Sequence, residues 1–282
     1  MVQISCWYAL TRDEASFPEY MQKLGVRHVI CDAAAVALPG RGRRISVQRL
    51  RRFRRSLERC GLELACVTVG WVRAETLDAA AGRRAREQIL RNIEALGKVG
   101  VPLAQLFLTV PAEADAAARR GQQAALEAYC REVAKVAGTA RVKVGVHGSQ
   151  NRGHLLTDLG SYKRLLAAVP SRWFGVTLCL GCLAICGSDP VRAVRQLGGR
   201  VFFLHARDVV LGPGGSWRDV NLGNGEVDYP AVRRAVERIG FRGPIQPEHL
   251  GSVSFEQGEE ITIARAVGFL RGLFDPAPRA AG

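Results

Sequence analysis

Four short apolar segments of the chain end in a side chain that can bind a metal ion. They are VKVGVH, ending at His147, FGVTLC, ending at Cys179, VFFLHARD, which contains His205, and PIQPEH, which contains Glu248. If each segment is a strand of a parallel α/β barrel, their carboxyl ends converge on one face, where catalytic residues collect. Two imidazoles, a thiolate and a carboxylate form a mixed N/S/O donor set suited to a divalent transition metal. Four such residues at four consecutive strand ends predict one metal centre.

Two further side chains beside these donors have types suited to catalysis. His249 directly follows the strand-end glutamate, where an imidazole can act as a general acid or base. Arg207 shares a strand face with His205 by the two-residue period of a strand, so we expect it to bind a substrate anion or an oxyanion. Each also has a structural interpretation: His249 as a packing neighbour of the ligand, and Arg207 in an ion pair with Asp208 or Asp228.

The cysteines offer a second interpretation of one ligand. The chain has eight, and most lie inside apolar segments, which is typical of buried thiols in a reducing compartment. Cys179, Cys182 and Cys186 form a C-x2-C-x3-C pattern that could also belong to an iron–sulfur or structural zinc site. No fourth cysteine follows nearby, and only Cys179 ends a strand, so the pattern favours Cys179 as part of the mixed site.

The elements that must position these residues alternate between strand and helix. The strand segments are short, apolar and rich in β-branched residues, as strands buried on both faces are. Several helix segments begin with a capping residue such as Ser46 and end at a glycine such as Gly100. Eight units in 282 residues predict an α/β fold, a single (β/α)8 TIM barrel over residues 1–275, with a disordered tail at 276–282. We expect strands at 3–8, 28–33, 63–69, 103–110, 142–147, 174–179, 201–206 and 243–249, and helices at 16–24, 46–60, 82–98, 121–137, 160–168, 189–197, 229–239 and 259–274.

Composition limits the partners of the chain. Hydrophobic residues make up 48% of it, but no apolar run reaches the roughly 20 residues that cross a bilayer. The first residues lack the basic and apolar regions of a secretory signal, so we expect a cytoplasmic protein without a membrane partner. The net charge of +14 suggests nucleic-acid binding, yet residues 49–59 place their arginines on one helix face opposite apolar residues, as a solvated helix does. We expect no nucleic-acid partner, and the apolar outer helix 259–274 permits a homo-oligomer.

These strand ends resemble those of mannonate dehydratases, metal-dependent barrels of the xylose-isomerase-like group. That family has a His after strand five, Cys-x-Gly after strand six, His-x-Arg after strand seven, Asp-His after strand eight, and a WYG-like first strand. The matching positions here are His147, Cys179-Leu180-Gly181, His205-Ala206-Arg207, Glu248-His249 and Trp7-Tyr8. The resemblance implies Mn²⁺ at the metal site, with Zn²⁺, Fe²⁺, Co²⁺ or Ni²⁺ as alternatives. It also implies water elimination from a sugar acid such as D-mannonate, with Trp7, Tyr8 and Arg207 at the substrate.

The chain departs from this family at three places. Glu248 stands where the family has Asp, the segment EQGEEITIARA lacks the family's tyrosine, and PAEADAAARRGQQ replaces its aromatic-rich loop after strand four. The segment NLGNGEVDYPAVRRAVERIGFRG instead resembles the sugar isomerase and epimerase branch. A metal-dependent sugar or sugar-phosphate isomerase or epimerase is therefore the alternative function.

Two interpretations outside this chemistry remain open. Endonuclease IV-type repair enzymes share the barrel and bind three zinc ions through many His, Asp and Glu ligands, but this chain has only five histidines. The second interpretation is a non-catalytic barrel that has kept the fold, and even the ion, but turns over no substrate.

Overall fold

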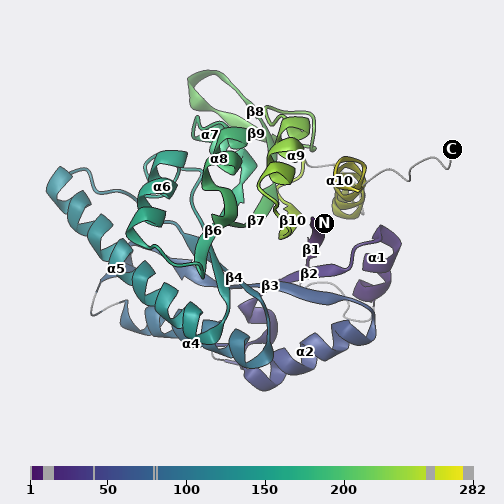
Figure 1. Cartoon of the computed structure of the whole chain (residues 1–282), viewed down its shortest axis with the longest axis horizontal. Coiled ribbons are helices and arrows are strands. Elements are labelled where there is room, and N and C mark those ends of the chain that lie inside the picture. Colours follow the sequence, from purple (N-terminus) through teal and green to yellow (C-terminus); the bar gives the residue numbers. More distant parts are fainter. Residues whose placement is uncertain are drawn as a thin grey trace.

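The computed structural model describes residues 2–8, 16–40, 42–78, 80, 82–251 and 258–275. Within them, eight parallel strands form a closed barrel in the ring order β1-β10-β7-β6-β5-β4-β3-β2, with helices outside it (Figure 1). This confirms the predicted (β/α)8 barrel. The expected tail at 276–282 lies outside the described residues. The barrel strands are β1 (Gln3–Trp7), β2 (His28–Asp32), β3 (Glu63–Val72), β4 (Leu103–Leu108), β5 (Lys143–His147), β6 (Phe174–Cys179), β7 (Val201–Ala206) and β10 (Pro244–Pro247).

Every predicted helix has a counterpart, and most bounds agree within two residues. The largest difference is α5, which begins at Ala116 because the Asp115 carboxylate accepts hydrogen bonds from the Ala117 and Ala118 amides. The α-helices are α1 (Ser16–Leu24), α2 (Val47–Arg59), α3 (Ala74–Leu77), α4 (Arg83–Val99), α5 (Ala116–Ala140), α6 (Leu159–Ala168), α7 (Leu180–Ile185), α8 (Pro190–Leu197), α9 (Tyr229–Arg238) and α10 (Gly258–Phe274), and short 3-10 turns are η1 (Ala33–Val36), η2 (Gly198–Arg200) and η3 (Pro213–Gly215).

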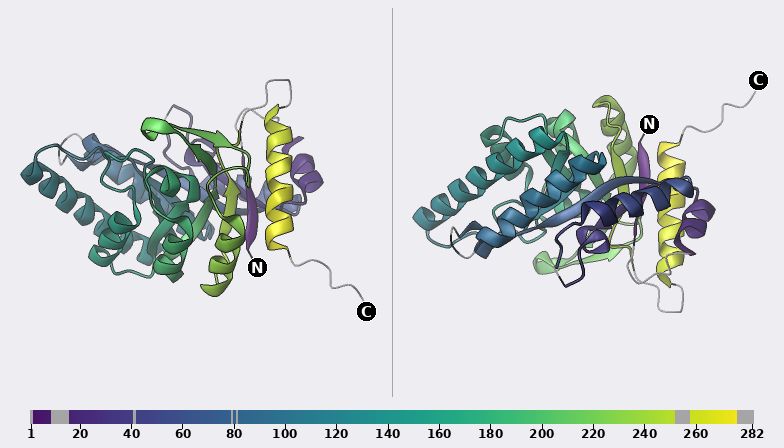
Figure 2. Two further views of the ribbon diagram at one scale, coloured as in Figure 1. Left: turned by 90° about the horizontal axis from the view of Figure 1, so that it is seen from above. Right: turned by 90° about the horizontal axis from the view of Figure 1, so that it is seen from below.

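The first and last strands close the ring. β1 pairs in parallel with β10 through Gln3 opposite Pro244 and Ile4 opposite Ile245. The Ser5 hydroxyl also donates to the Ile245 carbonyl across this seam, at 3.0 Å. Figure 2 shows β1 (purple) beside α10 (yellow), which therefore covers the seam from outside. Burial of the strands on both faces explains their nearly continuous apolar sequences.

An antiparallel hairpin on the carboxyl face was not predicted. β8 (Asp208–Leu211) pairs with β9 (Trp217–Val220) directly after β7. Asp208, which is fully buried, accepts hydrogen bonds from four backbone amides at its own turn and across the following loop. These donors are Val209, Gly223, Gly225 and Val227. Asp208 is thus a structural residue of the loop, and it does not pair with Arg207.

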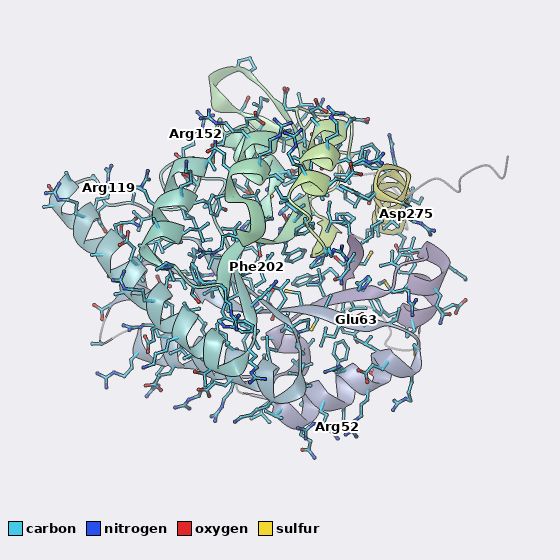
Figure 3. The ribbon with its side chains drawn as sticks, in the orientation of Figure 1. Arg52, Glu63, Arg119, Arg152, Phe202 and Asp275 are labelled. Atoms are coloured by element: carbon cyan, nitrogen blue, oxygen red, sulfur yellow. The ribbon has the colours of Figure 1, made fainter. Side chains whose placement is uncertain are left out.

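No helix in the described ranges has the length and apolar character needed to cross a membrane. The largest fully buried side chains include Phe17, Tyr129 and Phe174 between the helices and the barrel wall, together with one arginine, Arg207. Figure 3 shows many charged side chains on the outside of the helices, such as Arg52 on α2 and Arg119 on α5. A buried arginine within such a fold needs partners, and its partners lie at the carboxyl face of the barrel.

Candidate metal centre and active site

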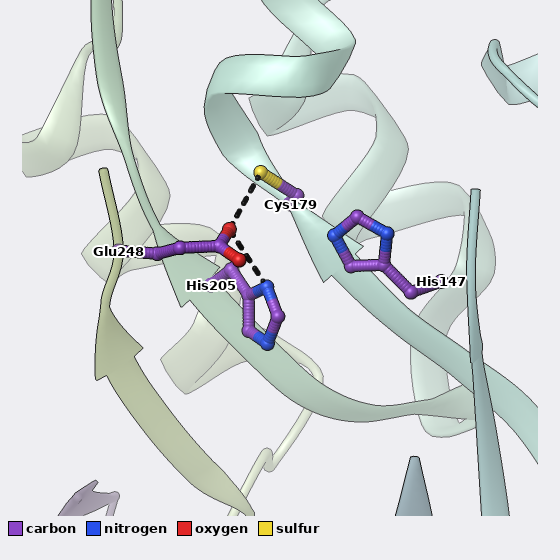
Figure 4. A group of neighbouring side chains, drawn as sticks. All are labelled: His147, Cys179, His205 and Glu248. Atoms are coloured by element: carbon purple, nitrogen blue, oxygen red, sulfur yellow. Dashed lines mark hydrogen bonds and ion pairs between the residues drawn. The ribbon is translucent and has the colours of Figure 1, made fainter. Parts of the chain in front are cut away.

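The four predicted metal ligands meet at the carboxyl ends of four neighbouring strands. One donor atom from each of His147, Cys179, His205 and Glu248 lies within 4.8 Å of the others. Cys179 and His205 are directly opposite in the β6–β7 register, and Glu248 follows β10 on the other side of β7. Figure 4 shows the four side chains converging from their strands. All are buried except Glu248, which is partly exposed, so the cluster lies at the floor of the barrel mouth.

His147 fits a metal ion by its hydrogen bonds. Its Nδ1 lies 2.5 Å from the Gly148 carbonyl oxygen, to which only a protonated nitrogen can donate. Its Nε2 then carries the lone pair, and this atom is buried without a hydrogen-bond partner among the described residues. Leaving a polar atom buried and unpaired costs about 1–3 kcal/mol. An imidazole oriented by a backbone carbonyl, with the free nitrogen turned to other donors, is the usual arrangement of a histidine ligand.

His205 is held by polar groups on both ring nitrogens. Nδ1 lies 2.9 Å from Glu248 Oε2, and Nε2 lies 3.0 Å from the side-chain nitrogen of Gln105. The Gln105 oxygen accepts a hydrogen bond from Thr68 at 3.0 Å, and all of Thr68, Gln105 and His205 are buried. This chain of hydrogen bonds crosses the barrel interior from β3 through β4 to β7. Gln105 therefore orients the His205 ring from the side away from the carboxylate.

The protonation of the cluster reflects its burial and its charges. Burial by itself lowers the pKa of His205, but the Glu248 carboxylate and the Cys179 sulfur outweigh this and raise that pKa to about 9. Burial would raise the pKa of Glu248, yet the nearby imidazoles of His205 and His147 hold it well below its usual range. Burial raises the pKa of the Cys179 thiol. A divalent ion favours the thiolate and neutral imidazoles, so the donor set fits such an ion and releases protons on binding it.

Arg207 is positioned differently from the sequence-based expectation. Its Nε and Nη2 donate to the two carboxylate oxygens of Asp219, at 2.7 and 3.3 Å, and its Nη1 donates to Gln150 at 2.6 Å. The guanidinium also lies over the Trp217 ring and is 1% exposed. These partners occupy the fork that a substrate anion would need. Arg207 thus links the β8–β9 hairpin to the loop after β5 and acts as a positioning residue. It pairs with neither Asp208 nor Asp228, the two partners expected from the sequence.

His249 lies at the mouth beside the metal cluster. Its side chain is 51% exposed, with Nε2 3.9 Å from Glu248 Oε1 and Nδ1 3.9 Å from Asp219 Oδ2. Its backbone has φ of 50°, a left-handed conformation that is uncommon outside glycine and that turns the chain after β10. An exposed imidazole between two carboxylates suits proton transfer with a bound molecule.

The two aromatic residues predicted at the substrate separate in the structure. Trp7 ends β1 and is 37% exposed. Tyr8 is 5% exposed, and its ring packs edge-on against Phe17 of α1 and Phe53 of α2. Tyr8 follows the last residue of β1, and its ring lies against the helices, apart from Trp7. Tyr8 belongs to the layer between barrel and helices, a position that does not favour its predicted role in substrate binding.

The opposite side of the mouth carries aromatic rings that sequence reasoning missed. Trp71 of β3 stacks on Phe107 of β4 with ring centroids 5.2 Å apart, and Phe107 contacts His147 at 4.7 Å. Arg43 lies 4.2 Å over the Trp71 ring and donates to Asp32, at the end of β2, at 3.0 Å. Arg43 is half-exposed, unlike Arg207. It therefore has room for a further partner.

The remaining cysteines do not join the site as ligands. Cys182 contacts Gln150 and Arg207, and Cys186 lies near the carbonyls of Ser149 and Gln150. The donor cluster found in the described ranges includes Cys179 alone of the three. The C-x2-C-x3-C pattern is therefore explained by helix α7, which begins with Cys179 as its cap.

Comparisons with known proteins agree with this fold. A family model described as xylose isomerase-like TIM barrel matches residues 19–273. The chain belongs to this family. Mannonate dehydratase of Streptococcus uberis is 29% identical over 174 residues, which are 55% of this chain and 49% of that protein. Mannonate dehydratase of Brachyspira hyodysenteriae is 36% identical over 92 residues, 30% of this chain and 25% of that protein. The chain thus spans half or less of the length of these relatives, and the predicted resemblance is confirmed.

Solved structures of the same fold include both predicted reaction classes. The mannonate dehydratase of Streptococcus suis serotype 2 superposes with a TM-score of 0.81 at 17% identity, covering 100% of this chain and 96% of that one. The D-psicose 3-epimerase of Clostridium cellulolyticum H10 gives 0.75 at 18% identity, covering 98% and 100%. At these identities the likeness establishes the fold, and the reaction must be argued from the site.

Proposed function

We propose that this chain, as one catalytic domain over residues 1–275, is a metal-dependent dehydratase that removes water from a sugar acid such as D-mannonate. The observation that carries this is the donor cluster of His147, Cys179, His205 and Glu248 within 4.8 Å. The dehydratase names of the curated relatives support the reaction class. Mn²⁺ is the proposed ion, and Zn²⁺, Fe²⁺, Co²⁺ and Ni²⁺ are alternatives because affinity alone does not select manganese.

The chemistry divides between the ion and the side chains. A divalent ion held by these four residues supplies Lewis acidity toward the carboxylate and hydroxyl oxygens of the substrate. His249 takes the proton from the carbon beside the carboxylate, since its imidazole is exposed at the mouth next to the cluster. The protonated His249 then gives this proton to the hydroxyl on the next carbon, which leaves as water, and the resulting enol becomes the keto acid. Asp219 positions His249 and Arg207 together, because it lies beside both.

Arg43 is the proposed partner of the substrate carboxylate. All three guanidinium nitrogens of Arg207 are engaged by Asp219 and Gln150, whereas the half-exposed Arg43 is tied to Asp32 through a single guanidinium nitrogen. A guanidinium with unengaged N–H groups can bind a carboxylate through two hydrogen bonds. Trp7, which is partly exposed at the end of β1, adds an apolar surface for the carbon chain.

The first experiment measures metal in the purified protein beside the Cys179→Ala and His205→Ala variants. Cys186→Ala serves as the matched control, because it removes a thiol from the same α7 region that contacts only backbone carbonyls. We expect about one equivalent of transition metal in the parent and the control, and loss in both ligand variants. Equal metal content in all four proteins, or none in any, would overturn the proposed centre. Sugar acids are then screened with Mn²⁺ restored.

A metal-dependent sugar isomerase or epimerase on the same centre is the second candidate. The ion pair of Arg207 with Asp219 favours this second candidate, because Arg207 is then unavailable to a substrate carboxylate. A neutral sugar has no carboxylate and needs no such cation. Both reactions begin with proton removal beside a carbonyl or carboxylate, but only the dehydratase releases water. Product analysis separates them: a deoxy keto acid from a sugar acid supports dehydration, and an epimer or ketose from a neutral sugar supports the alternative.

A further inference from the structure

A second cleft lies outside the metal site, between the start of α5, the loop after β5 and the start of α6. Its volume is about 560 Å³, within the range of small-molecule sites. Four guanidinium groups line it, from three separate parts of the chain: Arg119, Arg120, Arg152 and Arg164. Figure 3 labels Arg119 on the outer end of α5 and Arg152 in the region of α6 and α7.

Two of these arginines are held through Nε and Nη2, which leaves the third nitrogen of each guanidinium group unengaged by other described residues. Arg119 donates from Nε and Nη2 to the carbonyls of Glu113 and Ala114, at 2.7 and 3.2 Å. Arg152 donates from the same two nitrogens to the Ile185 carbonyl, at 3.1 and 2.7 Å. Neutral carbonyls fix the side chains without cancelling their charge. The Nη1 groups keep their donors for a further acceptor, so part of the ordering cost of binding is already met.

The side chains that line the cleft carry more positive than negative charge. Arg120 and Arg164 form no ion pair with any described residue, and the one lining carboxylate, Asp158, already accepts from the Ser161 amide as the cap of α6. His154 also lines the cleft, and its buried Nδ1 has no partner among the described residues. Four guanidinium groups facing one occupied carboxylate repel each other, and an anion with two or more charges relieves that repulsion.

A second arginine-lined surface of similar size provides the comparison. The hollow of about 540 Å³ over α2 also has four arginines, but all come from one helix face, at positions 49, 52, 55 and 59. Its one hydroxyl, on Ser56, is bonded to the Phe53 carbonyl. Cations from a single solvated face can spread apart, whereas those of the α5–α6 cleft are brought together by three elements. The difference lies in geometry, because the number of arginines is the same.

We propose that the α5–α6 cleft binds the phosphate group of a small phosphorylated molecule. Guanidinium groups bind phosphate oxygens through paired hydrogen bonds, and the dianion matches the excess of cations. The volume exceeds that of phosphate alone, so the rest of the molecule extends along the cleft. The site is independent of the proposed dehydratase reaction, and its binding can be measured on protein without catalytic metal.

The test is calorimetric titration of the 282-residue chain, at constant ionic strength, with inorganic phosphate, pyrophosphate and glucose 6-phosphate. The cleft variant is Arg120→Gln with Arg164→Gln, and the matched control is Arg52→Gln with Arg55→Gln on α2. All four side chains are exposed, so the variants should melt like the parent. We expect saturable one-to-one binding that weakens by about tenfold or more in the cleft variant and less than about twofold in the control.

The arms of the titration identify the source of the phosphate. Tighter binding of glucose 6-phosphate than of inorganic phosphate supports an ester ligand, and equal binding supports free phosphate at the same site. Equal weakening in both variants would mean that the net charge of the protein attracts anions generally, and would overturn the proposal. Absence of saturable binding by every probe would overturn it as well.

Discussion

Strands β5, β6, β7 and β10 end in nitrogen, sulfur and oxygen donors, whereas β1, β3 and β4 end in or near Trp7, Trp71 and Phe107. In the ring order, the first group are consecutive neighbours, and so are the strands from β4 to β1. The mouth of the barrel therefore has a metal half and an aromatic half. In the proposed function, the metal half holds the ion, and the aromatic half contacts the carbon chain and the charge of the substrate.

The largest effect is expected from a ligand in the metal half. His147→Ala should weaken metal binding by more than about 100-fold, because changes to residues behind a ligand already cost 10–100-fold. Trp71→Ala, in the aromatic half, should keep full metal content. Metal competition with a chromogenic chelator measures both. If both variants lose the ion alike, the division into halves is wrong.

Gln105 tests whether the metal half depends on the aromatic half for support. It comes from β4 yet contacts His205 of β7 across the barrel. Gln105→Leu should weaken metal binding by about 10–100-fold, the usual effect of removing the partner of a histidine ligand. Thr68→Val, one hydrogen bond further away, should have a smaller effect. Melting of the metal-free protein supplies the control, since a purely structural role would change it as much as the affinity.

Arg43 tests the substrate role of the aromatic half. Arg43→Gln should raise KM for an active sugar acid by about tenfold while kcat and metal content stay unchanged, because a charge-assisted pair worth about 1.4 kcal/mol is lost mainly in binding. Steady-state kinetics against a sugar acid and a neutral sugar measure this. An equal KM change for both substrates would show that Arg43 acts by packing on Trp71 and not on a carboxylate.

The smallest kinetic effect should come from Tyr8, which the fold removes from the mouth. Tyr8→Leu should lower the free energy of unfolding by about 1–3 kcal/mol, since it disturbs the packing of Phe17 and Phe53. KM should stay within about twofold. Trp7→Ala is the paired variant, with little change in stability and a measurable rise in KM. Urea unfolding and steady-state kinetics on the two variants measure these effects. If Tyr8 touched the substrate, Tyr8→Leu would raise KM more than Trp7→Ala does.

The sequence predicted the barrel and the metal cluster because both follow from local pattern. Apolar segments identify strands, and a parallel barrel brings their ends together without further information. Arg207 and Tyr8 could not be assigned this way. The choice of Asp219 as the partner of Arg207 depends on an unpredicted hairpin, and the outward ring of Tyr8 depends on where β1 ends. Gln105 could have been found from the sequence, because it is a polar residue inside the apolar run LAQLFL. A buried strand tolerates such a residue only if its side chain has a hydrogen-bond partner.

The seam between β1 and β10 separates the start and the end of the described barrel by 240 positions, as the bond from Ser5 to the Ile245 carbonyl records. During synthesis, β1 is made before the other barrel strands, yet one of its two neighbours, β10, is the last of them to be made. Its polar backbone edge must stay unpaired, or be covered by other chains, until that strand arrives. The ring therefore closes only after all eight barrel strands have been made, and the long stretch of chain between β1 and β10 makes their pairing slow to form.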